Sequence, residues 1–471
     1  MSVEVEALVK AQREFFLSGK TLDVGFRVEA LKKLKTAVQS HEEAINDALM
    51  KDLRKSRLES YMSETGMVLD EIGFELKHIK IWTKTRRVKT PIAQFLSKSF
   101  VVPEPYGVVL IMAPWNYPVQ LCLEPLIGAI AAGNTAIIKP SAYAPAVSSC
   151  IASLISQVFE PSFVAVVEGG REQNTQLLEQ KFDYIFFTGS STVGKLVMEK
   201  ASKNLTPVSL ELGGKSPVIV DHTANLKVSA RRLAFGKYLN AGQTCVAPDY
   251  LLIESSVKDA FLAEFKKAVE EFFAEDFSDS PVIVNEKHFK RLMGLLDGSI
   301  KQGAKIFLGG TGDLGTRFIE PTVLTNVTFD SPIMQEEIFG PILPVLEFGV
   351  GSEATGSVAG NVDEVLDIVK RRSKPLALYL FSNDKALQKK VLSSVSYGGG
   401  CINDTIIHLA TSYMGFGGVG ESGMGSYHGK KSFDTFTHYK SIVKKSNLID
   451  LPMRYHPYSE SKLKTIKMFM K

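Results

Sequence analysis

The chain has 471 residues, of which 45% are hydrophobic and 23% are charged, and its formal net charge is +4. This length exceeds what one hydrophobic core usually organises, so two or three domains are expected. Because the charge excess is small and acids and bases are interspersed, the sequence offers no basic footprint for nucleic acid. The longest apolar runs are also too short to span a membrane.

The cysteines and the two ends of the chain bear on metal binding, on the cellular compartment and on membrane contact. The four cysteines are scattered and show no spacing typical of a metal site, so no metal is expected. Sparse thiols favour a reducing cytoplasm, and the N-terminal residues lack the apolar core of a signal peptide. The basic, amphipathic residues 462–471 predict a terminal helix. Two alternatives stay open for it: packing on the body of the protein, or weak contact with a membrane surface.

The first half of the chain predicts a doubly wound α/β sheet. Residues 27–85 carry apolar side chains at helical spacing. Beyond them, five short apolar runs alternate with four amphipathic stretches, which is the order expected of a parallel sheet covered by helices. The predicted strands are 106–113, 135–139, 163–168, 184–187 and 208–211, and the helices between them are 118–132, 146–159, 172–180 and 192–202.

The second half repeats this alternation less regularly and predicts a second α/β domain. Two segments, 90–102 and 429–443, alternate and are rich in β-branched and aromatic residues. We expect them to pair as strands outside both cores and to offer an oligomerisation surface. A stretch rich in Gly, Ser and Ala at 350–359 predicts a surface loop. The predicted strands of this half are 250–254, 305–308, 342–348 and 376–381, with helices at 257–273, 362–371 and 386–394.

A glycine-containing turn follows the fourth predicted strand of the first half. It reads FTGSSTVG over residues 187–194 and includes Gly189, Ser190 and Gly194. Glycine lets a phosphate approach the backbone closely, and a helix N-terminus adds free amides and a positive dipole. The spacing differs from the usual GxGxxG. A phosphate site and a tight turn that needs glycine for steric reasons alone both fit this pattern.

Lys139 ends the second predicted strand, where dinucleotide-binding folds place a residue that faces the adenosine ribose. An acidic residue there would bond the 2′-hydroxyl group and repel a 2′-phosphate. The next residues, Pro140, Ser141 and Ala142, carry no charge. Electrostatics therefore permits NADP as well as NAD. The alternative is an ordinary lysine whose charged end extends from a strand end into water.

Four polar residues in turns are candidates for chemistry: Asn116, Glu211, Cys245 and Glu337. Each has an ordinary explanation when taken alone. A single cysteine is usually a small buried hydrophobe, and an asparagine after a strand is a common turn residue. Glu211 beside a Gly-Gly turn fits a solvated loop charge, and Glu337 fits a helix end. Their joint occurrence in this order favours a catalytic site.

Six motifs together resemble the aldehyde dehydrogenase superfamily over about residues 27–440. Two motif tails, CVAPDY at 245–250 and GGVGESGMGSYHG at 417–429, resemble its class 3 branch, which acts on fatty and aromatic aldehydes. The short N-terminus agrees with that branch. The six motifs are PWNYP (114–118), IIKPS (137–141), FTGS (187–190), LELGGKSP (210–217), GQTC (242–245) and EEIFGP (336–341).

The resemblance implies a catalytic role for three residues. Cys245 would attack the aldehyde carbon to form a thiohemiacetal. The Asn116 side-chain amide and the Cys245 backbone N–H would hold the oxyanion, where charge develops. After the nicotinamide has been reduced, Glu211 would activate the water that hydrolyses the thioester. The expected reaction is NAD(P)-dependent oxidation of an aldehyde, medium- or long-chain aliphatic or aromatic, to a carboxylic acid.

The resemblance also implies a cofactor site for NAD or NADP. Class 3 members often carry glutamate at the position of Ala142, and its absence predicts a relative gain for NADP. The implied contacts are Lys139, Ser141 and Ala142 at the adenosine ribose, Gly189, Ser190 and Gly194 near the pyrophosphate and adenosine, Glu337 at the nicotinamide ribose, and Phe339 beside it.

The expected architecture is a Rossmann-like cofactor domain, a second α/β catalytic domain and a small β element for oligomerisation, in a homodimer with no integral membrane segment. The boundaries are 1–85 and 105–208 for the NAD(P)-binding domain, 209–408 for the catalytic domain, 86–104 and 409–447 for the bridging strands, and 448–471 for a helical tail.

Two other functions compete with this interpretation. A CoA-acylating dehydrogenase or a cysteine acyltransferase would pass the thioester to a thiol or another acceptor, and would not need Glu211 to activate water. A binding protein on the same fold would not need Asn116, Glu211 and Cys245 together.

Overall fold

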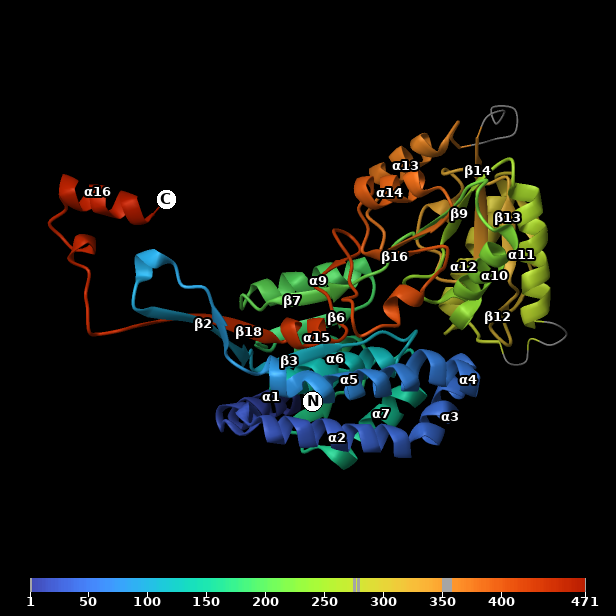
Figure 1. Ribbon diagram of the computed structural model, residues 1–471. Coiled ribbons are helices and arrows are strands. Elements are labelled where there is room, and N and C mark those ends of the chain that lie inside the picture. Colours follow the sequence, from blue (N-terminus) through green and yellow to red (C-terminus); the bar gives the residue numbers. More distant parts are fainter. Residues whose placement is uncertain (1, 274–276, 278–279, 350–357, 471) are drawn as a thin grey trace.

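A computed structural model describes residues 2–273, 277, 280–349 and 358–470. Figure 1 shows two lobes, each with its own sheet, and an arm that leads away from them and carries the C-terminus. Residues 350–357 of the predicted loop lie outside the described residues. The chain begins with helices that precede the first sheet: α1 (Ser2–Leu17), η1 (Lys20–Leu22), α2 (Val24–Ser40), α3 (Glu42–Leu53), α4 (Arg57–Ser60), the π-helical η2 (Tyr61–Thr65) and α5 (Gly66–Trp82).

The first lobe contains a six-stranded sheet in the order β17-β7-β6-β3-β4-β5. Five of the strands are parallel and correspond to the five that the sequence predicts, whereas β17 adds antiparallel to β7. Strand order reverses between β3 and β6, and ligands of such sheets bind where it does so, beyond the carboxyl ends of the strands. The strands are β3 (Val108–Met112), β4 (Thr135–Lys139), β5 (Val164–Val166), β6 (Tyr184–Thr188), β7 (Val208–Glu211) and β17 (Gly423–Met424).

Helices bury both faces of this sheet, as the continuous apolar strands predict. Alternate side chains of β3 enter different clusters: Leu110 packs with α1, α8 and α9, whereas Ile111 packs with α6 and α7. Helices α2 and α5 lie outside α6 and cover it. The helices between the strands are α6 (Gln120–Ala132), α7 (Pro145–Val158), α8 (Arg171–Leu178) and α9 (Ser191–Ser202).

The second lobe contains a seven-stranded sheet in the order β10-β13-β14-β9-β8-β15-β16. All neighbours are parallel except β10 and β13. Helices α12, α13 and α14 cover one face, and α10 and α11 cover the other. The strands are β8 (Pro217–Val220), β9 (Tyr250–Glu254), β10 (Lys305–Leu308), β13 (Thr322–Thr325), β14 (Ile342–Phe348), β15 (Ala377–Phe381) and β16 (Gly399–Ile402), with a hairpin of β11 (Gly312–Asp313) and β12 (Phe318–Ile319); the helices are α10 (Leu226–Tyr238), α11 (Lys258–Phe273), α12 (Glu286–Lys301), α13 (Val362–Arg371) and α14 (Lys385–Ser394).

The arm consists of β1 (Arg86–Val88), β2 (Ser97–Pro105) and β18 (Thr437–Lys445), with β2 in the middle. Pairing of β2 with β18 confirms that the two alternating segments meet. The prediction was wrong for the start of both segments: η3 (Ile92–Gln94) precedes β2 in the first, and α15 (Lys430–Thr435) is helical in the second, where it packs on α6. A Cβ at Gly128 of α6 would lie 2.8 Å from the Cβ of Ser432. The glycine at this position therefore allows α6 and α15 to approach each other closely.

The C-terminal helix α16 (Glu460–Phe469) lies at the far end of the arm, against η3 (Ile92–Gln94). Packing on the main body, one of the two alternatives for this tail, is therefore wrong. Its partner surface belongs to the arm, which extends beyond both lobes (Figure 1). Among the described residues no helix is both long enough and apolar enough to cross a membrane.

Candidate active site

Cys245 follows a sharp turn between α10 and β9. The turn begins in η4 (Leu239–Gly242), where Asn240, Ala241 and Gly242 take positive φ values of 51°, 52° and 72°. A Cβ at Gly242 would lie 2.4 Å from the carbonyl oxygen of Gly340, so only glycine fits there. This strained turn is buried. It places Cys245 in the wall of a cavity between the lobes.

Asn116 lies in the loop after β3 and is tied to the cysteine loop. Its side-chain Nδ2 donates to the carbonyl oxygen of Gln243 at 3.0 Å. A second tie joins the neighbouring residues, since the Tyr117 hydroxyl lies 2.5 Å from Oγ1 of Thr244. The structure thus brings Asn116 to the Cys245 loop, 129 residues later in the chain. The second N–H of the Asn116 amide has no acceptor among the described residues and is free for a ligand oxygen.

Glu211 ends β7 and is almost fully buried, with 3% of its surface exposed. Neither carboxylate oxygen has a hydrogen-bond partner in the described structure. Burial raises the pKa of Glu211 well above its ordinary value, because a charged carboxylate without a partner is costly in a buried site. Its Oε1 lies 3.1 Å from where a Cβ of Gly417 would be, so the class 3-like glycine run leaves room beside it.

The backbone N–H groups of Cys245 and Val246 favour the Cys245 thiolate, but burial outweighs them. Burial raises the pKa of the thiol to about 12, and the nearby carboxyl groups of Glu337 and Glu211 add to the shift. Since thiolate is the attacking form, a positive charge beside the thiol would favour the nucleophile. The residue as a whole keeps partial exposure, which leaves it reachable from the cavity.

Glu337 and Phe339 come from the second lobe and meet the segment that follows β7. The Gly214 N–H donates to Glu337, and a Cβ at Gly213 would lie 2.2 Å from its Oε2. Burial raises the pKa of Glu337 to about 8. Phe339 has φ 51°, a strained value for a bulky residue, and its ring meets Trp115 edge-on at 5.4 Å.

The residues expected at the adenosine end lie at the carboxyl ends of β4 and β6. Lys139 is 3% exposed and its Nζ donates to the carbonyl oxygen of Pro140 at 2.6 Å, while burial lowers its pKa to about 8. Lys139 is therefore not the solvated strand-end lysine of the alternative. Ala142 is exposed and Ser141 is partly exposed.

The glycine turn has a steric explanation as well as a functional one. A Cβ at Gly189 would lie 2.6 Å from the Phe187 ring, and a Cβ at Gly194 would lie 2.8 Å from Leu212. Ser190 caps α9 by accepting from the Val193 N–H at 3.4 Å. A side chain at either glycine would thus have to displace the end of a neighbouring side chain, whether or not a phosphate binds here.

Three residues that the sequence did not single out fit a dinucleotide. Thr188 ends β6 directly opposite Glu211, and its buried Oγ1 has no partner in the described structure. Val193 and Leu196 leave 37% and 44% of their surfaces exposed on the first turns of α9, where a flat ring can pack. Thr188 stands inside a motif and was recognisable, whereas exposure on one helix face leaves no mark in a sequence. Unpartnered polar atoms and an uncovered apolar face fit the expected cofactor.

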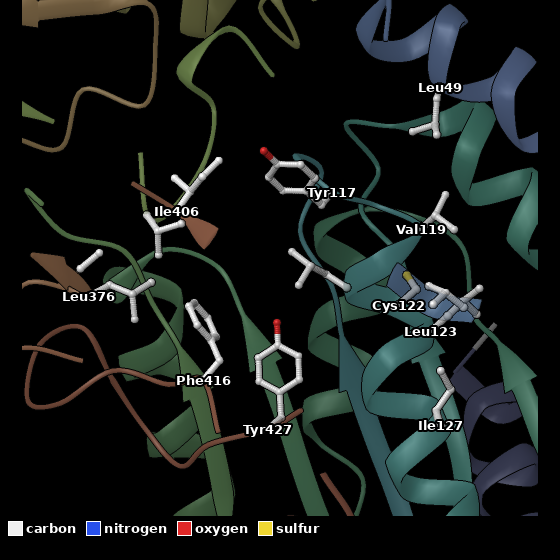
Figure 2. Packing of buried hydrophobic residues seen from close by; sticks show 14 of the residues in the cluster. Leu49, Tyr117, Val119, Cys122, Leu123, Ile127, Leu376, Ile406, Phe416 and Tyr427 are labelled. Carbon is white, nitrogen blue, oxygen red and sulfur yellow. The ribbon is translucent and has the colours of Figure 1, made fainter. Parts of the chain in front are cut away.

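An apolar cavity of about 160 Å³ leads to Cys245. Figure 2 shows Tyr117, Ile406, Phe416 and Tyr427 around a common space. Among the described residues, no Asp, Glu, Lys or Arg side chain lines this cavity. The lining includes one histidine, His428, and it is uncharged at neutral pH because burial lowers its pKa to about 3. The apolar and aromatic lining residues are Met62, Met67, Tyr117, Leu121, Phe235, Leu239, Ile406, Ile407, Leu409, Ala410, Phe416 and Tyr427.

Comparison with known proteins places this site in a family. Over 98% of its length the chain is 50% identical to the 4,4'-diaponeurosporen-aldehyde dehydrogenase of Staphylococcus aureus, covering 97% of that protein. It is 44% identical to aldehyde dehydrogenase family 3 member A2 of Macaca fascicularis, over 99% of this chain and 94% of that one. These relatives confirm the class 3-like branch.

A solved structure described as the substrate-bound state of Staphylococcus aureus AldH has 49% sequence identity to the chain. It superposes with a TM-score of 0.94 over 99% of each chain. The family model for the aldehyde dehydrogenase family matches residues 2–442. The chain therefore belongs to the aldehyde dehydrogenase family, whose members oxidise aldehydes with NAD or NADP.

Proposed function

We propose that Cys245, Asn116 and Glu211 carry out this oxidation in the roles that the motifs imply. The Cys245 thiolate adds to the aldehyde carbon, and the carbonyl oxygen becomes an oxyanion that accepts from the free Asn116 N–H and the Cys245 backbone N–H. Glu211 later takes a proton from a water whose oxygen adds to the thioester carbon. The carbon–sulfur bond then breaks, and the carboxylic acid leaves.

The cofactor supplies the acceptor for the hydrogen and electron pair of the aldehyde, together with the positive ring charge that favours the Cys245 thiolate. We assign its nicotinamide end to Glu337, Phe339 and Thr188. Lys139, Ser141 and Ala142 would hold the adenosine ribose. The phosphates and the adenine ring would lie along the start of α9, at Gly189, Ser190 and Gly194, with Val193 and Leu196 as the apolar wall.

The substrates that this site fits best are medium- or long-chain aliphatic and aromatic aldehydes. The uncharged apolar cavity at Cys245 is the observation that carries this assignment. Burial of apolar surface adds about 0.8 kcal/mol per methylene group, whereas a charged substrate would lose its hydration without gaining a partner.

Hydrolysis, not transfer to a thiol, is the favoured second half of the reaction. Glu211 is buried, lacks a partner in the described structure, and lies near enough to raise the pKa of the Cys245 thiol. A CoA-acylating enzyme has no use for such an acid. The rival is tested by the same assay, since it would require CoA for turnover.

The finer assembly is also proposed. The β2–β18 arm, which lies outside both cores, is the surface that we assign to a homodimer. A cytoplasmic location is supported by four free cysteines without a disulfide. The domain division predicted above is kept, with β17 as an addition to the cofactor sheet from the segment assigned to bridging strands.

The test is turnover of aldehydes of rising chain length with NAD and with NADP, in the absence of CoA. We expect reduced nicotinamide and free carboxylic acid in a 1:1 ratio, with kcat/KM rising from propanal to octanal. A need for CoA would replace hydrolysis with acylation, and preference for a charged aldehyde would contradict the substrate assignment.

A further inference from the structure

A buried ion pair outside the catalytic motifs holds the backbone of Asn116. Lys55 lies between α3 and α4, and Glu64 lies in the π-helical η2. Their side chains are completely buried, and Lys55 Nζ lies 2.7 Å from Oε1 of Glu64. The same Nζ donates to the backbone carbonyl oxygen of Asn116 at 2.9 Å and lies 4.0 Å from the centre of the Tyr117 ring.

Glu64 completes this support from the other side. Its Oε2 accepts from the backbone N–H groups of Val119 and Gln120, at 2.9 and 3.0 Å, where α6 begins. Val119 has no capping side chain of its own, so Glu64 satisfies amides that the helix start leaves open. The residues from Asn116 to Gln120 are thereby fixed at both ends.

A second donor reaches the same carbonyl from the cysteine loop. Asn240 Nδ2 donates to the Asn116 carbonyl oxygen at 2.8 Å and to the Gln243 carbonyl oxygen at 3.2 Å. The Glu59 carboxylate in turn accepts from the Asn240 backbone N–H at 2.8 Å. Two donors thus bind the backbone carbonyl oxygen of Asn116, and its side-chain amide donates to the Gln243 carbonyl oxygen. These hydrogen bonds fix the direction of the second N–H of the Asn116 amide.

We infer that Lys55, with Glu64 as its counter-ion, is a positioning residue that aims the Asn116 amide at the oxyanion. Lys55 is not among the residues that line the cavity, so it acts through the neighbours that it contacts, Asn116 and the Tyr117 ring. This inference rests on the oxyanion role proposed for Asn116. Burying two charges costs desolvation energy. A role in positioning Asn116 explains why the buried Lys55–Glu64 pair is present.

The test is a double-mutant cycle between this pair and Asn116. Lys55→Met alone leaves the Glu64 charge buried without a counter-ion and is expected to destabilise the fold. The informative variant is therefore Lys55→Met/Glu64→Gln, in which the glutamine oxygen still accepts from α6. We expect its kcat to fall about 10- to 100-fold, since small misplacements cost rates of this order. The KM for aldehyde and the dissociation constant for NAD are expected to be unchanged.

The second arm of the cycle applies the same two substitutions to the Asn116→Ala protein. If the pair acts through the Asn116 amide, they change kcat there by less than about twofold, because the group that they aim is absent. Equal losses in both backgrounds, or no loss in the wild-type background, would overturn the inference. A wild-type rate for Asn116→Ala alone would instead overturn the proposed oxyanion role.

A matched control separates this effect from general loss of stability. Lys258 and Glu347 form a partly buried pair at 2.8 Å in the second lobe, away from the cavity. Lys258→Met/Glu347→Gln removes the same chemical groups and is expected to leave kcat within about twofold of the wild-type value. The melting temperature of each variant, compared with the assay temperature, shows whether the protein is folded when kcat is measured.

Discussion

The Asn116→Ala substitution tests the candidate oxyanion site most directly. It removes the one side-chain donor at that site and leaves the Cys245 backbone N–H in place. Loss of one such donor costs about 3 kcal/mol, which corresponds to roughly a 100-fold fall in kcat at about 1.4 kcal/mol per tenfold. The expected loss in kcat/KM is similar, because the donor acts in the transition state more than on the bound aldehyde.

The structure also bounds the effect of this substitution on folding. Asn116 Nδ2 makes one hydrogen bond, to the Gln243 carbonyl oxygen, and that oxygen keeps its second donor, Asn240 Nδ2, at 3.2 Å. No buried acceptor is left unpaired, so the loss of stability should be about 1 kcal/mol. The backbone bonds to the Asn116 carbonyl oxygen do not involve the side chain and remain.

The assay is steady-state oxidation of hexanal with NAD, together with thermal unfolding. Asn46→Ala is the control, because Asn46 is a buried amide in α3 whose Oδ1 has no partner in the described structure. It removes the same side chain without touching the site and should keep the wild-type kcat. A folded Asn116→Ala protein that loses less than about fivefold in kcat would refute the reasoning.

Three further predictions follow from charge and burial. Ala142→Glu, at an exposed position, should raise the NAD/NADP ratio of kcat/KM about five- to tenfold by repelling the 2′-phosphate; Ala142→Gln should not, and a ratio raised equally by both would contradict the charge argument. Since burial raises the pKa of Cys245 to about 12, its alkylation by iodoacetamide without cofactor should accelerate about tenfold per unit from pH 7 to 9; subtracting the Cys245→Ala protein isolates this thiol, and a plateau below pH 9 would be the contrary result. Glu75 is fully buried without a partner in the described structure, and its pKa is raised well above the ordinary value by burial and by Glu71 and Asp434, against Lys430. Its folded form holds a proton that the unfolded chain releases above about pH 4.3, so unfolding free energy falls as pH rises; Glu75→Gln should gain about 1–3 kcal/mol at pH 8 relative to pH 5 in urea titrations, and an unchanged pH dependence would disprove it.

Local patterns predicted the first sheet because its strands are short apolar runs that helices bury on both faces. The runs around Leu110, Ile137 and Phe186 are apolar at successive positions, which few structures other than a parallel sheet accommodate. Strands β8, β13 and β16 were not predicted. Two glycines begin β16 and weaken its pattern, whereas β8 and β13 are short β-branched runs of four residues that were missed although their composition is typical of strands. The helical start of the second arm segment was missed because α15 forms where it can pack on α6.

The catalytic candidates were recognisable because each motif keeps its residues within a few positions of one another. Cys245, Asn116 and Glu211 stand in such motifs, and their meeting in space was implied by the resemblance alone. The cavity has no comparable signal. Its walls come from η2, α5, α6 and α10, from the loops that carry Tyr117 and Cys245, and from the segments after β16. An apolar residue on any of them looks like ordinary core.

What the sequence by itself determined is the alternation of five strands and four helices in the first sheet, the chemistry of the motifs and the absence of a charge at Ala142. What only the tertiary structure decided is which distant groups touch: Lys55 on the Asn116 carbonyl, Gly417 beside Glu211, and α16 at the tip of the arm. The physical reason is range. Strand and turn preferences act between neighbours in the chain, whereas the buried hydrogen bond between Lys55 and Asn116, 61 positions apart, exists only once the first lobe has folded.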